Sequence, residues 1–307
     1  MAISSGGVKL YLELWQRGLF KQIGSVIELG SIDLGLSLNE FEKLVRAAGI
    51  PAYERESFRN LANWPGRPRC SSRAFYELLG VERYDCIDLS EEHGAIALDL
   101  NLPLDKRSLW GQYDLVTDFG CAEHAFNIAE AYRTMHRLCK PSGFIIAIQN
   151  ACGEGNGYYN FDLSFFEGFA AANNYRVLFS SYIICPRREG AGDYEFHVPL
   201  SRELLSAVDW SKVQYICICY VMQKQNDGDF RFPYQGAYLS EQQRHYGYEL
   251  QFLPDPPSRS YVPVVNLGHV VSGIRTRALI GLTIRAVLRS VGTRCSRMVR
   301  HWLRGSS

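Results

Sequence analysis

The chain has 307 residues, of which 47% are hydrophobic and 21% are charged, which is typical of a globular protein with one large domain and an appendage. The formal net charge is +1, but the charges are unevenly distributed along the chain. Residues 274–307 carry eight arginines and no acidic residue. The rest of the chain has 25 basic and 32 acidic residues, which argues against a nucleic-acid-binding protein.

The nine cysteines are scattered along the chain, and none of them forms a Cys-x-x-Cys pair. Cys217 and Cys219 alternate along an expected strand, so both should point to one side of a sheet. We expect reduced thiols in a cytoplasmic protein and no zinc site. The amino terminus lacks the layout of a signal peptide, and no apolar run has the length of a transmembrane segment.

Expected helices and strands alternate along most of the chain. Apolar residues at helical spacing predict helices over 8–23, 39–48, 72–79, 123–138 and 163–172. Short apolar runs predict a first strand through Val26 and Ile27 to Glu28, and further strands over 84–89, 95–103, 113–120, 144–148, 177–184 and 213–222. Strands that alternate with helices imply right-handed crossovers and a mostly parallel sheet. The last two strands have no clear helix between them, which favours antiparallel pairing, and about 50–71 we expect an irregular insertion.

The stretch Ser25–Gly35 predicts a strand, a glycine-containing turn and then a helix. Gly30 is free to adopt backbone angles that other residues avoid, and it lets a ligand approach the main chain. This order is that of the opening unit of a nucleotide-binding α/β sheet. The alternative is a buried strand that ends in an ordinary turn.

An acidic residue lies at or near the carboxyl end of each of the first three strands: Glu28, Asp88 and Asp99. Ligands of open α/β sheets bind outside these ends, and a carboxylate is suited to accept hydrogen bonds from two ribose hydroxyls. We therefore expect Asp88 at a ribose and Asp99 near an adenine amino group. For each acid alone, a solvated residue at a strand end is the alternative.

The motifs in this order resemble those of class I S-adenosylmethionine-dependent methyltransferases, in particular bacterial ones, over about residues 24–225. They read Val-Ile-Glu-Leu-Gly, Cys-Ile-Asp-Leu, Leu-Asp-Leu, Tyr-Asp-Leu-Val-Thr-Asp-Phe-Gly-Cys-Ala-Glu-His and Leu-Cys-Lys-Pro-Ser-Gly-Phe. The resemblance implies a Rossmann-like α/β sheet of seven mostly parallel strands with an antiparallel last strand and helices on both faces. It divides the chain into a methyltransferase-like domain, 1–225, and a C-terminal extension, 226–307.

The resemblance also implies that S-adenosyl-L-methionine lies over the carboxyl edge of the sheet. It implies Glu28 and Gly30 at the methionine end, Asp88 at the ribose, Asp99 and Leu100 at the adenine, and Asp118 and Phe119 beside the sulfonium. Leu89 is a further implied cofactor-binding residue.

The turn after Gly30 departs from the three-glycine pattern of the family. Ile32 and Leu34 stand at the second and third glycine positions and would crowd the methionine unless the turn has shifted. Ser31 and Asp33 are predicted to compensate by binding the amino-acid portion of the cofactor. A further departure is that Glu123 and His124 lack the first acid of a Glu-x-x-Glu-His element, so we predict no metal.

On the acceptor side, His124 is the candidate general base, because its unperturbed pKa lies near neutrality. A capping or packing histidine is the alternative. Glu123, Tyr158, Tyr159 and Asn160 are predicted to bind the acceptor, although loop aromatics also serve as surface packing. The resemblance implies a small or sugar-like acceptor.

Two other functions remain open at this point. A non-catalytic scaffold with the same fold would have lost cofactor binding through the altered glycine turn. A nicotinamide-dependent oxidoreductase would need Gly-x-Gly-x-x-Gly, but Ile32 stands where the middle glycine belongs. Separate titrations with S-adenosylmethionine and NAD distinguish the three.

The segment 274–304 is predicted to form a basic amphipathic helix. Its arginines lie on one face and its apolar residues on the other: Arg285, Arg289, Arg297, Arg300 and Arg304 against Ile280, Ile284, Val287, Val291, Met298 and Trp302. Such a helix is suited to peripheral contact with an anionic membrane, here at the inner face. The alternatives are a helix docked on its own domain and a frayed tail interrupted by Gly281 and Gly292.

Charge alone provides a test of the membrane hypothesis. Each arginine near an anionic surface should contribute about 1 kcal/mol, screened by salt. The full chain should float with anionic vesicles at low salt and be released as the salt concentration rises, whereas a chain ending at Ser272 should stay in solution under both conditions. Unfolding or aggregation of the shortened chain would show instead that the apolar face covers the body's own core.

Overall fold

The computed structural model describes residues 2–155, 157–187, 195–200 and 202–233. The predicted tail helix at 274–304 and Cys295 lie outside these residues. No helix in the described part of the chain combines the length and the apolar character needed to cross a bilayer. The eight described cysteines are free thiols.

The fold is a Rossmann-like α/β fold built on one central sheet, in the order β5–β4–β2–β6–β7–β10–β8–β9. Its strands are β2 (Ser25–Leu29), β4 (Arg83–Asp88), β5 (Ile96–Ala97), β6 (Tyr113–Phe119), β7 (Cys139–Gly153), β8 (Tyr175–Pro186), β9 (Phe196–Val198) and β10 (Val213–Lys224). The first five strands in this order are parallel. Strand β10 lies between β7 and β8 and is antiparallel to both, which confirms the predicted pairing of the last two strands.

The described part of the central sheet has eight strands, so the expected count of seven is wrong. The additional strand, β9, pairs antiparallel with the outer edge of β8. Phe196 and Val198 are buried on one face of the sheet, and His197, the residue between them in the chain, is also buried. A three-residue alternation of this kind is too short to stand out in the sequence.

A second, two-stranded sheet joins the amino terminus to the glycine turn. Strand β1 (Ala2–Ile3) pairs in parallel with β3 (Asp33–Leu34), which follows directly after the turn. The sequence analysis did not foresee either strand, because each has only two residues.

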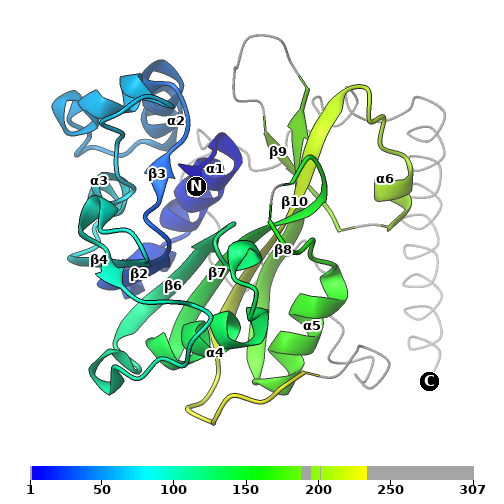
Figure 1. Cartoon of the computed structure of the whole chain (residues 1–307). Coiled ribbons are helices and arrows are strands. Elements are labelled where there is room, and N and C mark those ends of the chain that lie inside the picture. The colour runs from blue at the N-terminus through cyan, green and yellow to red at the C-terminus, as the bar shows by residue number, and fades with distance from the viewer. Residues whose placement is uncertain (1, 156, 188–194, 201, 234–307) are drawn as a thin grey trace, which may run out of the picture.

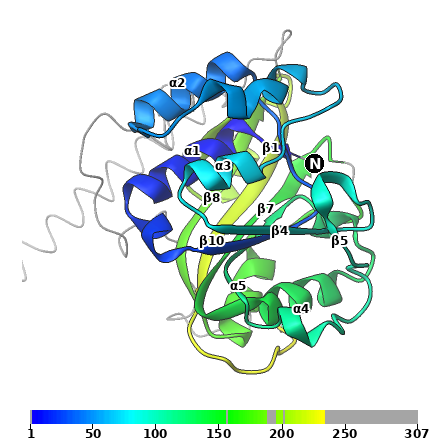
Figure 2. The ribbon, with the colours of Figure 1, turned by 90° about the vertical axis from the view of Figure 1, so that its left-hand side faces the viewer.

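Helices cover both faces of the central sheet, as expected, and Figure 2 shows the three layers. On one face lie α1 (Ser5–Gln16), α2 (Leu38–Ala48) and α3 (Arg73–Leu78), and on the other lie α4 (Ile128–Leu138) and α5 (Leu163–Ala172) (Figure 1). The short α6 (Arg202–Ser206) precedes β10. Each layer of helices encloses its own hydrophobic core against the sheet. Along β10, Cys219 belongs to the first core and Cys217 packs against it, so both point to one side of the sheet, as predicted.

Helix α2 illustrates how the local sequence sets these elements. Ser37 precedes the helix, and its hydroxyl accepts a hydrogen bond from the N–H of Glu40, which satisfies one free donor of the first turn. Phe41 and Val45 face the core. Gly49 ends the helix in the left-handed conformation, with φ of 74°.

Several predicted elements are shorter than expected. The strand over 95–103 is reduced to β5, because Asp99 accepts hydrogen bonds from the backbone and side chain of Asn101 and turns the chain away from the sheet. The helix over 8–23 is interrupted at Gly18, which has φ of 82°, and continues as a 3₁₀ turn, η1 (Leu19–Gln22). The insertion at about 50–71 contains a 3₁₀ segment, η2 (Arg55–Asn63).

Candidate functional site

A pocket of about 180 Å³ lies at the carboxyl edge of the sheet, between the loops that follow β4, β5 and β6. It brings together five of the predicted site residues: Asp88, Leu89, Asp99, Leu100 and His124. Its remaining lining residues are Ile87, Leu98, Asn101, Cys121 and Ala125. Sequence reasoning did not single out these five, although each is a near neighbour of a predicted one.

Two larger hollows lie away from this edge. One, of about 620 Å³, is lined by Trp15, Phe20 and Leu79 among others, next to the start of β2. The other, of about 590 Å³, lies beside the start of α2. We regard the carboxyl-edge pocket as the candidate site, because ligands of open α/β sheets bind at that edge and acidic groups converge there.

Asp88 connects the ends of β2 and β4. Its two carboxylate oxygens accept hydrogen bonds from the N–H groups of Ser31, at 2.8 Å, and Ser90, at 2.9 Å. Burial works against ionisation of Asp88, but the bonds from Ser90 and Ser31 outweigh it and hold its pKa below the ordinary value. A carboxylate has about four lone-pair sites, so Asp88 has the capacity to accept further hydrogen bonds from a ligand.

Asp99, which follows β5, lines the same pocket. Hydrogen bonds from the N–H and the side-chain amide of Asn101 reach one oxygen, at 2.8 and 2.9 Å, and lower the pKa of the carboxyl. Leu89 and Leu100 provide apolar surface next to the two acids, and the side chain of Leu89 is 72% exposed. Acceptor oxygens beside apolar walls are the chemistry that a nucleoside requires.

Glu28, in contrast, lies in the interior on the face covered by α1 and α3. It is fully buried in β2, and its carboxylate accepts hydrogen bonds from the hydroxyls of four residues: Ser72, Tyr76 and Tyr84 at close range and Thr117 at 3.4 Å. Burial raises the pKa of Glu28 to about 7, although the four hydroxyls act in the opposite direction. The structure therefore does not bring Glu28 into the pocket with Asp88.

The glycine turn has shifted from the pattern expected of the family. Gly30 adopts φ of 89°, and its N–H donates to the carbonyl of Ile87 at 2.6 Å. Ile32 and Leu34 are fully buried in the first core, so they do not crowd the carboxyl edge. Gly35 lies against the amino terminus, where an added Cβ would come within 2.7 Å of that of Ala2.

Ser31 and Asp33 have partners within the protein. The hydroxyl of Ser31 donates to the carbonyl of Glu92 at 2.8 Å. Asp33 is 1% exposed and contacts Nε2 of His93 at 2.7 Å and the guanidinium of Arg69 at 2.8 Å. These contacts fasten the loop after β4 across the turn after β2.

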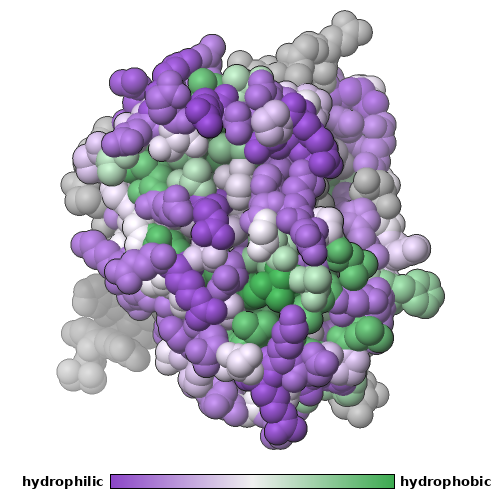
Figure 3. All heavy atoms as spheres, turned by 60° about the vertical axis from the view of Figure 1, so that its left-hand side comes forward, coloured by the Kyte–Doolittle hydropathy of each residue, from purple (hydrophilic) through white to green (hydrophobic). Residues whose placement is uncertain are grey.

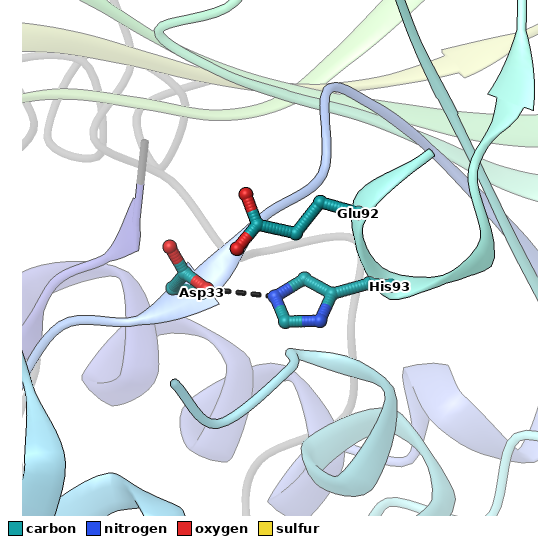
Figure 4. A group of neighbouring side chains, drawn as sticks. All are labelled: Asp33, Glu92 and His93. Carbon is teal, nitrogen blue, oxygen red and sulfur yellow. Dashed lines mark hydrogen bonds and ion pairs between the residues drawn. The ribbon is translucent and has the colours of Figure 1, made fainter. Parts of the chain in front are cut away.

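Asp33, Glu92 and His93 form a group whose ligand atoms lie within 4.8 Å of one another, which is close enough to hold a metal ion (Figure 4). The guanidinium of Arg69 already lies between the two carboxylates, 2.8 Å from Asp33 and 3.2 Å from Glu92. A metal ion would have to displace this cation. Glu123 and His124, on which the prediction of no metal was based, do not belong to this group.

Asp118 and Phe119 lie at the end of β6 on opposite faces of the sheet. Asp118 is fully buried, and one of its oxygens accepts hydrogen bonds from the N–H groups of Cys121 and Ala122, which holds the 3₁₀ turn η5 (Ala122–His124) in place. Burial raises the pKa of Asp118 to about 6, against the effect of these two bonds. Phe119 packs beneath α1, with its ring centroid 5.7 Å from that of Tyr11.

The predicted acceptor residues form a second group beside the pocket. Glu123 accepts a hydrogen bond from the N–H of Asn150 at 2.9 Å, and its carbonyl accepts one from the N–H of Tyr158 at 2.8 Å. Asn160 bonds to the side chain of Asn150. Burial raises the pKa of Glu123, and Nε2 of His124 lies 3.8 Å from its carboxylate, so His124 connects this group to the pocket.

The site fits the two halves of S-adenosylmethionine, the nucleoside and the amino acid, to different degrees. The pocket offers the carboxylates of Asp88 and Asp99 beside apolar walls, which fits the nucleoside half. At the amino-acid half, Glu28 and Asp33 are fully engaged with internal partners. Binding of that half therefore depends on Ser31, on the main chain near Gly30, or on an exchange of the Arg69 ion pairs.

Comparison with solved structures finds chains that resemble this one at low sequence identity. Solved structures with a similar fold include an S-adenosylhomocysteine complex of 1,6-didemethyltoxoflavin-N1-methyltransferase from Burkholderia thailandensis, at 10% identity, with 71% of this chain and 80% of that chain covered and a TM-score of 0.38. A putative methyltransferase from Bacillus halodurans matches at 13% identity, over 70% and 99% of the two chains, with a TM-score of 0.37. The trans-methyltransferase CalH, in complex with SAH, matches at 11% identity, over 72% and 60%, with a TM-score of 0.32. No family model and no curated protein matches the sequence.

The buried carboxyl of Glu28 predicts a pH dependence of stability. Its folded-state pKa of about 7 lies above the ordinary value of 4.5, so the folded chain retains a proton that the unfolded chain releases between these values. This contribution to the free energy of unfolding is complete below about pH 4.5 and is lost as the pH rises to about 7. Glu28→Gln should remove the effect, which amounts to up to about 3 kcal/mol.

Urea unfolding of the wild type and the variant at several pH values between 5 and 8 measures the difference. The variant should gain stability relative to the wild type as the pH rises. Glu77→Gln, an exposed change on the neighbouring helix α3, serves as the matched control and should follow the wild type. Parallel pH profiles for Glu28→Gln and the wild type would contradict the account.

Proposed function

We propose that this protein is an S-adenosylmethionine-dependent methyltransferase that acts on a small-molecule acceptor. The observation that carries the proposal is the convergence of Asp88, Asp99 and His124 on one pocket at the carboxyl edge of a Rossmann-like sheet. Strand β10 is antiparallel to both of its neighbours, β7 and β8, as the family resemblance implied for the last strand.

In this proposal the nucleoside half of the cofactor occupies the pocket. Asp88 accepts hydrogen bonds from the ribose hydroxyls, Asp99 from the adenine amino group, and Leu89 and Leu100 pack on the purine. When bound, S-adenosylmethionine supplies an electrophilic methyl group. The protein's part is to hold the acceptor in line with that group and to exclude water.

On the acceptor side we assign the general-base role to His124, for acceptors that must lose a proton. The carboxylate of Glu123 lies 3.8 Å from Nε2 of His124. The loop with Tyr158, Tyr159 and Asn160 borders the same region and is proposed to contact the acceptor. The eight free thiols in the described part of the chain support a cytoplasmic location.

Removal of the Asp88 carboxylate tests the cofactor assignment. Asp88→Ala should weaken binding of S-adenosylhomocysteine by about 1–3 kcal/mol, or roughly five- to 150-fold, because the ribose loses charge-assisted hydrogen bonds. Isothermal calorimetry measures the affinity. Asp105→Ala, an exposed change after β5 and outside the pocket, is the matched control and should bind as the wild type does.

Two results would contradict the proposal. Absence of binding by the wild type at millimolar S-adenosylhomocysteine would favour the scaffold alternative. Equal affinity of Asp88→Ala and the wild type, with both proteins folded by circular dichroism, would remove Asp88 from the site.

A further inference from the structure

Three large apolar side chains are exposed beside the pocket. Leu102 is 60% exposed, Phe126 is 73% exposed and Tyr158 is 69% exposed. They lie on the loops that follow β5, β6 and β7, three strands whose carboxyl ends share one edge of the sheet. We refer to these three residues as the apolar ledge. Figure 3 shows hydrophobic side chains gathered at the surface and bordered by hydrophilic ones.

Hydrogen bonds between the loops hold the ledge in place. The N–H and side-chain amide of Asn127 donate to Asn101 at 2.9 and 3.0 Å, which joins the chain next to Leu102 to the chain next to Phe126. The hydroxyl of Tyr159 donates to the carbonyl of Phe126 at 2.6 Å. The rings of Phe126 and Tyr158 meet edge to face, with centroids 5.6 Å apart.

The ledge is continuous with the pocket. Asn101 and Ala125, which line the pocket, immediately precede Leu102 and Phe126 in the chain. The titratable groups that line the pocket are the acids Asp88 and Asp99 together with Cys121 and His124, so this edge disfavours a negatively charged ligand. The hydrogen bonds from Asn127 to Asn101 and from Tyr159 to the carbonyl of Phe126 join neighbouring loops. They occupy polar groups that a hydroxyl-rich ligand would otherwise use.

We propose that the apolar ledge binds the methyl acceptor, and that the acceptor is a flat, uncharged aromatic or conjugated molecule rather than a free sugar. This inference rests on the proposed function and names its substrate class. Exposed aromatic rings held in a fixed geometry offer faces and edges for stacking with little further loss of conformational entropy. Three side chains suit a small molecule, because a stable protein interface requires about 800 Å² from each partner.

Binding of the neutral planar dye Nile red to the full chain, measured by fluorescence titration, tests the proposal. Phe126→Ser and Tyr158→Ser should each weaken binding at least tenfold. Phe232→Ser is the matched control: Phe232 is 59% exposed and packs against Phe230, outside the pocket lining, and its loss should leave binding unchanged. Leu102→Ser serves as a further ledge variant if either aromatic variant fails to fold.

Competition distinguishes the two acceptor classes. 2-Naphthol should displace the dye, and methyl glucoside at the same concentration should not. Any of three results would overturn the inference. The wild type and the folded ledge variants could bind the dye equally, Phe232→Ser could weaken dye binding as much as the ledge variants do, or methyl glucoside could displace the dye. If the dye binds at the ledge but calorimetry detects no binding of S-adenosylhomocysteine, the methyltransferase proposal is refuted instead. Failure of the acceptor inference and failure of the proposed function are therefore distinguishable.

Discussion

The carboxyl group of Glu28 imposes the strongest constraint on the fold, because it is fully buried on a central strand. A buried carboxyl is costly unless hydroxyl or N–H donors surround it. Here the donors come from three other elements or their flanks: Ser72 and Tyr76 at α3, Tyr84 on β4 and Thr117 on β6. Satisfying one acid therefore fixes α3 against three adjacent strands.

Acidic residues also organise the loops at the carboxyl edge of the sheet. Asp88 holds the turn after β2 through the N–H of Ser31, and Asp118 holds η5 through two N–H groups. Both acids thus have structural roles, but only Asp88 also lines the pocket. The network of Asp33, His93 and Arg69 ties the neighbouring turn in the same way. The edge therefore presents the carboxylates of Asp88 and Asp99 in one pocket.

The features that could be predicted from the sequence are those that depend on a local residue pattern or on the order of a parallel sheet. Asp88 and Asp99 follow adjacent parallel strands, so their meeting in one pocket follows from topology. The orientation of Glu28 was not predictable, because its hydroxyl partners are 44 to 89 residues away in the chain. The two-residue strands β1 and β3 and the three-residue β9 escaped notice because short strands carry no periodicity. The burial of Ile32 and Leu34 likewise depends on the packing of α1 and β1 rather than on the turn itself.

A crystal structure of the full chain with S-adenosylhomocysteine tests the central claim most directly. The account predicts the adenine between Leu89 and Leu100 and the ribose hydroxyls within hydrogen-bond distance of the Asp88 carboxylate. Two results would contradict this account: the ligand in the hollow lined by Trp15, Phe20 and Leu79, or the ligand in any other position that leaves Asp88 without contact to the ribose.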